Sequence, residues 1–385
     1  MNLNKPHNPN FSSGPCPKRP NWDGKYIHTA LLGRSHRSKP AKMQLKQLID
    51  QIKLTLELPS DFQVGIVPAS DTGAFEMAMW NFLGPLPVDV LYWESFGKDW
   101  VNDIVEQLKI QNCNILSAPY GQLPDLNQVR KNSDICFTWN GTTSGVKVPN
   151  SNWIPEDRQG LVLCDATSAI FAQPLDWPKL DVTTFSWQKV MGGEAGHGVI
   201  ILSPKALKRL KSYVPSWPVP KIFRLKEGEK INWDLFSGKT INTPSMLCVS
   251  DALDAMDWIR TIGGIKKVEY LSNENFKVVQ NWLDKSNWAE NSVKTSEIRS
   301  NTNVCIHIKD NAFKALDEKN QRAFFVEFSE FLEAKNVAFD IIGYPDAPPG
   351  LRIYTGATVE KINLQRLLPW LDYTYQNQKF FSQFN

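Results

Sequence analysis

Residues 183–198 read TTFSWQKVMGGEAGHG, and this stretch indicates how the chain is organised. An apolar run leads into Gln188 and Lys189, and a glycine-rich segment follows before the next apolar run, 198–203. The pattern predicts a buried strand, a sharp turn that the glycines permit, and a second strand. A lysine at such a junction can have a lowered pKa and act as an amine nucleophile. The glycines match neither the Walker A pattern nor G-x-G-x-x-G, so a nucleotide loop is not indicated.

Short apolar runs alternate with helical patterns from about residue 42 onward. Such strands predict an α/β fold in which helices cover both faces of a mostly parallel sheet. Beyond a long predicted helix at 245–264 the pattern changes to a small α+β domain. We therefore expect an N-terminal arm (1–20), a large domain (21–260) and a small C-terminal domain (261–385). The predicted strands of the large domain are 64–70, 88–93, 134–140, 161–168, 182–187 and 198–203, and a helix is predicted at 100–111. The small domain includes an apolar run at 337–344.

Composition limits the class of protein. A net charge of +3 over 385 residues, with scattered basic residues, argues against a nucleic-acid partner. No apolar run approaches the roughly 18 residues of a membrane span. The six cysteines form no C-x-x-C pair and several lie in apolar runs, which is typical of reduced cysteines in a cytoplasmic protein.

Polar residues follow the predicted strands where a site is expected. In open α/β sheets, ligands bind outside the carboxyl ends of the strands. Ser70-Asp71-Thr72 opens a helix after the first strand, with Ser70 or Asp71 suited to be its N-cap. The backbone N–H groups of this helix start could bind an anion. The other strands are followed by Glu94-Ser95-Phe96, by Asn140-Gly141-Thr142, by Asp165, and by Gln188-Lys189.

Asp165 and Lys189 at neighbouring strand ends, near a helix start suited to phosphate, match the needs of pyridoxal phosphate. That cofactor needs a lysine to bind its aldehyde, a carboxylate for its ring nitrogen and a cradle for its phosphate. The alternative interpretation is a structural ion pair between Asp165 and Lys189. The residue pattern alone leaves both open.

Two further groups of cations could bind anions. LLGRSHRSKP (31–40) gathers Arg34, His36, Arg37 and Lys39 in a segment without a regular pattern. It is either a solvated charged run or an anion clamp, since arginine binds carboxylate and phosphate with two parallel hydrogen bonds. Arg352 lies in an apolar strand pattern, and its partner could be a substrate carboxylate.

Taken together, these segments resemble the phosphoserine aminotransferase family, in class V of the fold-type I pyridoxal-phosphate enzymes. The resemblance covers nearly the whole chain. It is carried by FSSGP (11–15), SHRS (35–38), NGTTSG (140–145), DATS (165–168), SWQK (186–189), NTPS (242–245) and GLRIYTG (350–356).

The resemblance implies a homodimer, and amino transfer from L-glutamate to 3-phosphohydroxypyruvate in serine biosynthesis. A phosphorylated four-carbon acid of vitamin B6 synthesis would be a second acceptor. Lys189 would bind the cofactor and Asp165 its ring nitrogen. The cofactor phosphate would be bound by Asp71, Thr72 and Gln188 and, from the partner subunit, by Asn242 and Thr243. Thr142 would lie near the ring hydroxyl and Phe96 on the ring. The substrate would be bound by His36, Arg37 and Arg352.

The chain departs from the family in two places. Members often carry an arginine where this chain has Ser70-Asp71-Thr72, and a tryptophan stacks on the ring where Phe96, or Trp100 one turn on, stands here. Another class V activity is an alternative, such as an alanine–glyoxylate type aminotransferase. A cysteine desulfurase is disfavoured, because Cys305 lies in a predicted strand rather than a loop. A non-catalytic protein of this fold would need neither Lys189 nor Asp165.

Overall fold

The computed structural model describes residues 3–377, so the outermost residues of the predicted arm and small domain lie outside it. A seven-stranded sheet forms the centre, in the order β1-β9-β8-β7-β4-β2-β3. β9 is antiparallel to both of its neighbours, and all other pairs are parallel, which confirms the mostly parallel α/β prediction. The strands are β1 (Gln63–Pro68), β2 (Val88–Tyr92), β3 (Cys113–Ser117), β4 (Asp134–Thr138), β7 (Val162–Asp165), β8 (Val182–Ser186) and β9 (His197–Leu202).

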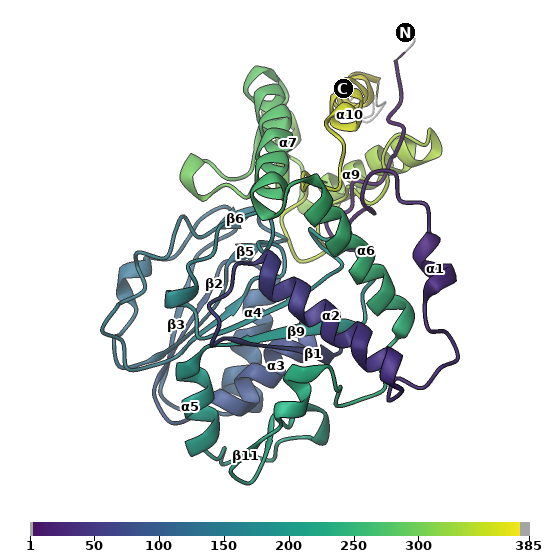
Figure 1. Cartoon of the computed structure of the whole chain (residues 1–385). Helices are drawn as coiled ribbons and strands as arrows, with labels where there is room; N and C mark the ends of the chain where they lie inside the picture. The colour runs from purple at the N-terminus through teal and green to yellow at the C-terminus, as the bar shows by residue number, and fades with distance from the viewer. Residues whose placement is uncertain (1–2, 378–385) are drawn as a thin grey trace.

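Helices cover both faces of this sheet because its strands are apolar on both sides. Along β9, Val199 and Ile201 enter one core and Ile200 and Leu202 enter the other. The first core is closed by α2 (Lys39–Thr55) and α6 (Met246–Ile262), and the second by α3 (Ser70–Phe82), α4 (Ser95–Asn102) and α5 (Pro204–Ser212). Figure 1 shows α2 and α6 side by side across the sheet from α3.

The sequence predictions were inexact at the sheet's edge. The helix expected at 100–111 instead begins at Ser95 and continues as a π-helical turn, Asp103–Gln107. The edge strand β3 was not predicted, because Cys113, Asn114 and Ile115 are only partly buried or exposed and lack a clear apolar pattern. The predicted helix 245–264 is confirmed as α6, which ends at Gly263 with a φ of 117°.

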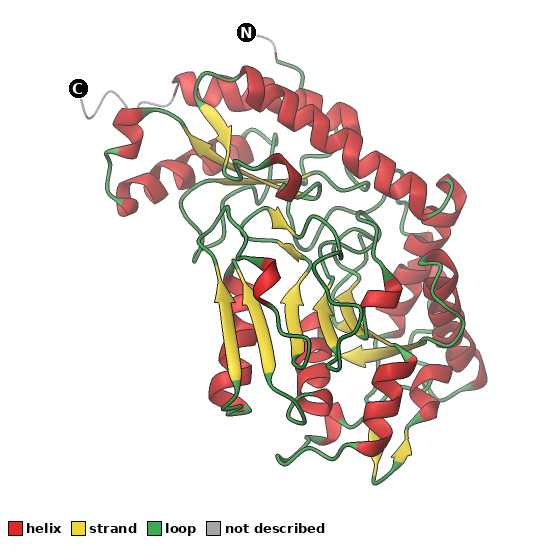
Figure 2. Cartoon of the chain, turned by 90° about the vertical axis from the view of Figure 1, so that its left-hand side faces the viewer, coloured by secondary structure: helices red, strands yellow, loops and turns green. Residues whose placement is uncertain are grey.

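A third core lies around a three-stranded antiparallel sheet, at the upper left in Figure 2. Its aromatic centre includes Phe324, Phe325 and Phe328 from one helix. The predicted run 337–344 makes only isolated bridges at Phe339 and Ile342. The elements here are α7 (Ile265–Lys285), β12 (Ala289–Asn291), β13 (Asn303–Ile308), α8 (Asn311–Lys314), α9 (Glu318–Ala334), β14 (Leu351–Tyr354) and α10 (Lys361–Asn377).

Shorter elements complete the described chain, and none of the described helices is long and apolar enough to cross a bilayer. They are α1 (Lys25–Thr29), the ribbons β5 (Asn140–Gly141) with β6 (Val146–Lys147) and β10 (Lys226–Glu227) with β11 (Lys230–Ile231), and 3₁₀ turns at Leu126–Gln128, Trp177–Lys179, Lys221–Phe223, Trp233–Ser237 and Ser296–Ile298.

Candidate active site

Seven of the residues expected at the site line one cavity of about 90 Å³. β7 and β8 are parallel neighbours, so Asp165 at the end of β7 lies beside the end of β8, three residues before Lys189. The remaining walls come from the start of α3, from α4 and from the turn after β4. The seven are Asp71, Thr72, Phe96, Thr142, Asp165, Gln188 and Lys189.

The Lys189 amine is buried without a counter-ion. Its Nζ donates a hydrogen bond to the backbone carbonyl of Ser13 at 2.8 Å, and no ion pair joins it to Asp165 within residues 3–377. Burial lowers the pKa of Lys189, and the nearby positive charge of Arg352 lowers it further. The structural ion pair that the sequence left open is therefore not formed.

The N-terminal arm contacts Lys189 and its neighbour Gln188. Cys16 N donates to the carbonyl of Gln188 at 2.8 Å, so the FSSGP segment lies against the lysine. Gly14 has a φ of 155°, and a Cβ there would lie 1.9 Å from the Lys189 Nζ. The glycine is thus required by the close approach of the lysine. Sequence reasoning missed this contact, because Ser13 and Lys189 are 176 residues apart.

The Asp165 carboxylate is positioned by two donors. Trp100 Nε1 donates to Oδ2 at 3.2 Å and Thr167 N donates to Oδ1 at 3.0 Å. Asp71 lies beside it, and burial, together with the charge of Asp165, raises the pKa of Asp71 well above its ordinary value. The Asp71 side chain was not expected to take part in the site.

The start of α3 presents uncapped backbone N–H groups to the cavity. Ser70 or Asp71 was expected as the N-cap, but the cap residue is Ala69, and no side chain caps the helix. Ala69 and Ser70 have φ values of 65° and 53°, a left-handed conformation that costs non-glycine residues roughly 1–3 kcal/mol each. The unpaired N–H groups and the helix dipole suit an anion.

Six buried polar atoms of the wall lack a hydrogen-bond partner among the described residues. They are both carboxyl oxygens of Asp71, the hydroxyls of Thr138, Thr167 and Ser186, and the side-chain carbonyl of Gln188. Buried polar groups are almost always satisfied in native proteins. A cavity with such atoms, a buried amine and a positioned carboxylate fits a compact ligand with an aldehyde, an aromatic nitrogen and a phosphate.

Arg352 lies beside this cavity in an aromatic stack. Its guanidinium carbon is 5.8 Å from the centre of the Tyr344 ring, and that ring is 5.6 Å from the ring of Phe96. Arg352 Nε is buried without a hydrogen-bond partner, and Arg352 forms no ion pair within the described chain. Tyr344 was missed as a site residue, because the sequence placed it only at the end of the run 337–344 of the small domain.

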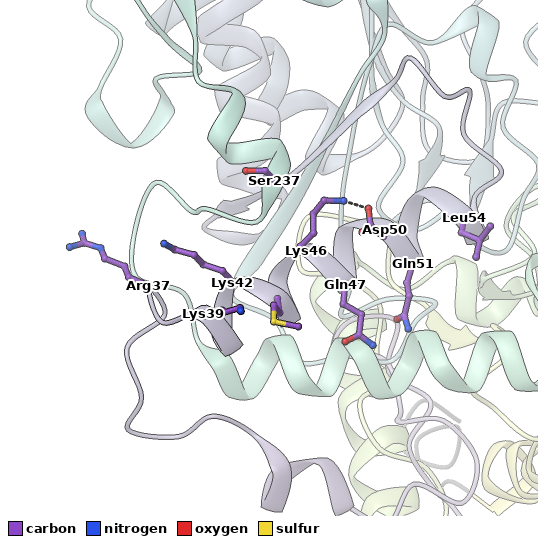
Figure 3. A pocket seen from close by; sticks show the side chains of 10 residues that line it. Arg37, Lys39, Lys42, Lys46, Gln47, Asp50, Gln51, Leu54 and Ser237 are labelled. Carbon is purple, nitrogen blue, oxygen red and sulfur yellow. Dashed lines mark hydrogen bonds and ion pairs between the residues drawn. The ribbon is translucent and has the colours of Figure 1, made fainter.

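The other cationic and polar residues expected at the site do not line this cavity. Arg37 instead lines a separate cavity of about 930 Å³ along α2, with Lys39, Lys42 and Lys46 (Figure 3). His36 is partly buried in the loop before α2. Before α6, Asn242 is partly buried and Thr243 is exposed. Within one chain these four residues, His36, Arg37, Asn242 and Thr243, are therefore not part of the Lys189 cavity.

Cysteine and metal chemistry are not indicated in the part of the chain that the structure describes. Cys305 lies in β13, as expected, and burial raises the pKa of its thiol to about 12. Burial likewise raises the pKa of Cys16 to about 12. No group of three or more His, Cys, Asp or Glu side chains among the described residues could hold a metal ion.

Glu94 is a buried carboxyl that joins α4 to the turn after β4. It accepts hydrogen bonds from Gly97 N at 2.8 Å and from the Thr143 hydroxyl at 2.8 Å. Burial nevertheless raises the pKa of Glu94 from its ordinary 4.5 to about 7. The folded state therefore binds this proton more tightly than the unfolded state does.

We expect Glu94→Gln to change how stability depends on pH. Relative to the variant, the wild type should lose up to about 3 kcal/mol of unfolding free energy as pH rises from 4.5 to about 7 and no more above that. Urea unfolding at a series of pH values measures this. Glu106→Gln, on the exposed side of the next turn, is the control, and equal pH profiles for the two variants would contradict the assignment.

Comparisons with known proteins identify the family of this chain. Residues 122–320 match the family described as Aminotransferase class-V. A phosphoserine aminotransferase from Methanosarcina mazei is 52% identical over 96% of this chain and 97% of its own length. The crystal structure of a phosphoserine aminotransferase from Cytophaga hutchinsonii has a TM-score of 0.81 at 22% identity, covering 94% of this chain and 98% of that one.

A pyridoxal-phosphate-bound phosphoserine aminotransferase from Trichomonas vaginalis shares the fold, with a TM-score of 0.77 at 18% identity over 95% of this chain and all of that chain. The family match covers more than half of the chain, and the match to the Methanosarcina protein covers nearly all of it. These two matches establish family membership. The chain belongs to the class-V aminotransferase family.

Proposed function

We propose that this protein is a pyridoxal-phosphate-dependent aminotransferase that moves the amino group of L-glutamate to 3-phosphohydroxypyruvate, giving O-phospho-L-serine and 2-oxoglutarate. The observation that carries the proposal is the buried Lys189 amine, free of any ion pair within residues 3–377, facing a cavity shared with Asp165. The Methanosarcina phosphoserine aminotransferase, 52% identical, supports this choice among class V activities.

The residues present fit the cofactor. Lys189 would bind its aldehyde, and Asp165 would hold its ring nitrogen protonated. The Asp71 and Thr72 N–H groups and the Gln188 side chain would hold its phosphate, with Thr142 near the ring hydroxyl and Phe96 against the ring face. When bound, pyridoxal phosphate withdraws electrons from the substrate's α-carbon.

Lys189 would also act as the base. A buried amine with a lowered pKa is more often neutral, and a neutral amine can take the proton from the substrate's α-carbon. Asp165, fixed by Trp100 and Thr167, keeps its charge in place during that transfer. A positioned charge of this kind needs no reorganisation when the substrate's charge develops.

Substrate recognition would be divided between two chains. Arg352 is proposed to bind the substrate carboxylate. Its Nε is buried without a hydrogen-bond partner, and its positive charge helps to lower the pKa of the nearby Lys189. His36 and Arg37 are proposed for the substrate phosphate, and Asn242 and Thr243 for the cofactor phosphate. Since none of the four lines the Lys189 cavity of its own chain, we propose that a homodimer brings them there from the partner subunit.

The proposed organisation is a large domain at 21–260, a small domain at 261–385 and an arm at 1–20. The central sheet falls in the first range and the aromatic core around α9 in the second. The arm joins them, since Phe11 lies in the aromatic core and Ser13 contacts Lys189. We propose a cytoplasmic location, which the six cysteines without a disulfide support.

Arg37→Ala is expected to raise KM for phosphorylated substrates by roughly 10- to 100-fold, because it removes charge-assisted hydrogen bonds worth about 1.5–3 kcal/mol. KM for L-glutamate should change little, since glutamate carries no phosphate. Lys131→Ala, an exposed lysine paired with Asp157, is the matched control. An unchanged KM for O-phospho-L-serine would support the alternative interpretation, in which residues 34–39 are a solvated charged run.

Steady-state rates with a panel of acceptors test the function. We expect 3-phosphohydroxypyruvate to exceed pyruvate and glyoxylate by orders of magnitude in kcat/KM. Measurable turnover of 3-hydroxy-2-oxo-4-phosphobutanoate would support a role in vitamin B6 synthesis. Preference for glyoxylate with L-alanine as donor would instead select the alternative activity.

A further inference from the structure

A second cavity, of about 530 Å³, shares no lining residue with the Lys189 cavity. Its walls come from the β6 segment and the 172–176 loop on one side, and from α7 and residues 296–301 on the other. It therefore lies where the central sheet's loops meet the chain that leads into β13. Figure 1 places α7 and β6 side by side at this junction.

The cavity holds two cations without counter-ions. Lys147 Nζ donates only to the backbone carbonyls of Val148 and Glu297, at 3.4 and 3.2 Å. Arg299 donates to the carbonyls of Val293 and Lys294. Neither forms an ion pair among the described residues, and burial lowers the pKa of Lys147. Partly buried cations of this kind favour an anionic ligand.

The same cavity has acceptors for a positive group. Asp176 accepts a hydrogen bond from the Ser151 hydroxyl at 2.7 Å and forms no ion pair in the described chain. Gln173, only 4% exposed, donates through Nε2 to Asn140 and Asn301, both at 3.0 Å, while its carbonyl Oε1 is buried without a described partner. An ammonium group can pair with a carboxylate and with an amide carbonyl.

The remaining lining is largely apolar and aromatic. Trp139, Leu175 and Phe276 contribute to it. Ligand sites of 300–1,000 Å³ typically combine such a lining with a few charged groups that fix orientation. A lining that combines cations, a carboxylate and aromatic side chains complements a zwitterion with a bulky apolar side chain.

We propose that this junction cavity binds a free α-amino acid with an aromatic side chain, its carboxylate at Lys147 and Arg299 and its ammonium at Asp176 and Gln173. Gln173 links the site to the cofactor cavity. Its Nε2 donates to Asn140, whose Nδ2 donates to the Ser168 hydroxyl at 2.9 Å, and Thr142 donates to the same hydroxyl at 2.9 Å. Ser168 and Thr142 both line the Lys189 cavity.

Isothermal titration calorimetry on the enzyme with its cofactor bound tests the site with three probes. L-phenylalanine carries both charges, 3-phenylpropionate lacks the ammonium and 2-phenylethylamine lacks the carboxylate. L-phenylalanine should bind tightest of the three. Equal affinities for all three probes would overturn the proposal, as would the absence of L-phenylalanine binding at millimolar concentration. Neither result requires a variant.

Variants then locate the binding. Lys147→Gln should weaken L-phenylalanine and 3-phenylpropionate about tenfold or more, and Asp176→Asn should do the same for L-phenylalanine and 2-phenylethylamine. Lys131→Gln is the surface control and should change nothing. Arg352→Gln should leave L-phenylalanine binding intact. Loss of binding in Arg352→Gln with retention in Lys147→Gln would place the ligand in the Lys189 cavity and refute the junction site.

Discussion

Lys189→Ala is expected to abolish amino transfer, with kcat falling by at least about 10⁴-fold, while the protein keeps its fold. General-base catalysis alone contributes about 10²–10⁴-fold, and the variant would also lose the covalent attachment of the cofactor. Stability should change little, because the amine makes one hydrogen bond, to Ser13, and has no counter-ion within residues 3–377. Single-turnover assays with O-phospho-L-serine, together with thermal unfolding, measure both effects.

The matched control is Lys205→Ala. Lys205 is another lysine whose pKa burial lowers, and it donates to two backbone carbonyls, of Arg158 and Gly160. It lies at the start of α5 and does not line the Lys189 cavity. Full activity in Lys205→Ala and none in Lys189→Ala would assign the chemistry to one amine. Substantial turnover in Lys189→Ala would remove Lys189 from the reaction.

Asp165→Asn should lower kcat by about 10²- to 10³-fold, the loss typical when one electrostatic stabiliser is removed. KM should change much less, because Asp165 is proposed to hold the ring nitrogen rather than the substrate. An asparagine retains one acceptor for Trp100 or Thr167 but presents no negative charge. Steady-state kinetics separate kcat from KM.

A second readout distinguishes this electrostatic role from a structural one. The charge of Asp165 helps to raise the pKa of Asp71, so Asp165→Asn should lower the Asp71 pKa toward its ordinary value. NMR titration of the Asp71 carboxyl measures it. Asp254→Asn, a buried carboxylate paired with Arg19 away from the cavity, is the control. An equal loss of kcat in Asp254→Asn would mean that both substitutions lower activity by disturbing the folded structure.

The part of the site that lies on neighbouring strand ends could be predicted from the sequence. Asp165 and Lys189 each follow a short apolar run, and the carboxyl ends of parallel neighbours meet at one edge of a sheet. The structure places both there, with Gln188 and Thr142. Local patterning was sufficient, because β7 and β8 are fully buried and each contains a short run rich in apolar residues.

Contacts made across long sequence separations could not be predicted. The Ser13 carbonyl of the arm accepts a hydrogen bond from Lys189, and the Tyr344 ring packs against Phe96 at a tilt of 50°. No local sequence pattern marks either contact. The Asp71 carboxyl faces Asp165 only because Ala69 and Ser70 adopt left-handed φ values. A helix cap was the expected role for Ser70 or Asp71, and tertiary constraints overrode that preference.

The visible absorbance spectrum of the protein with pyridoxal phosphate, titrated with O-phospho-L-serine, tests the central claim most directly. We predict a visible band that Lys189→Ala lacks and that O-phospho-L-serine removes as the cofactor passes from its aldehyde to its amine form. L-alanine at the same concentration should leave the band nearly unchanged. A protein that stays colourless with pyridoxal phosphate, or a band that O-phospho-L-serine does not alter, would contradict the account.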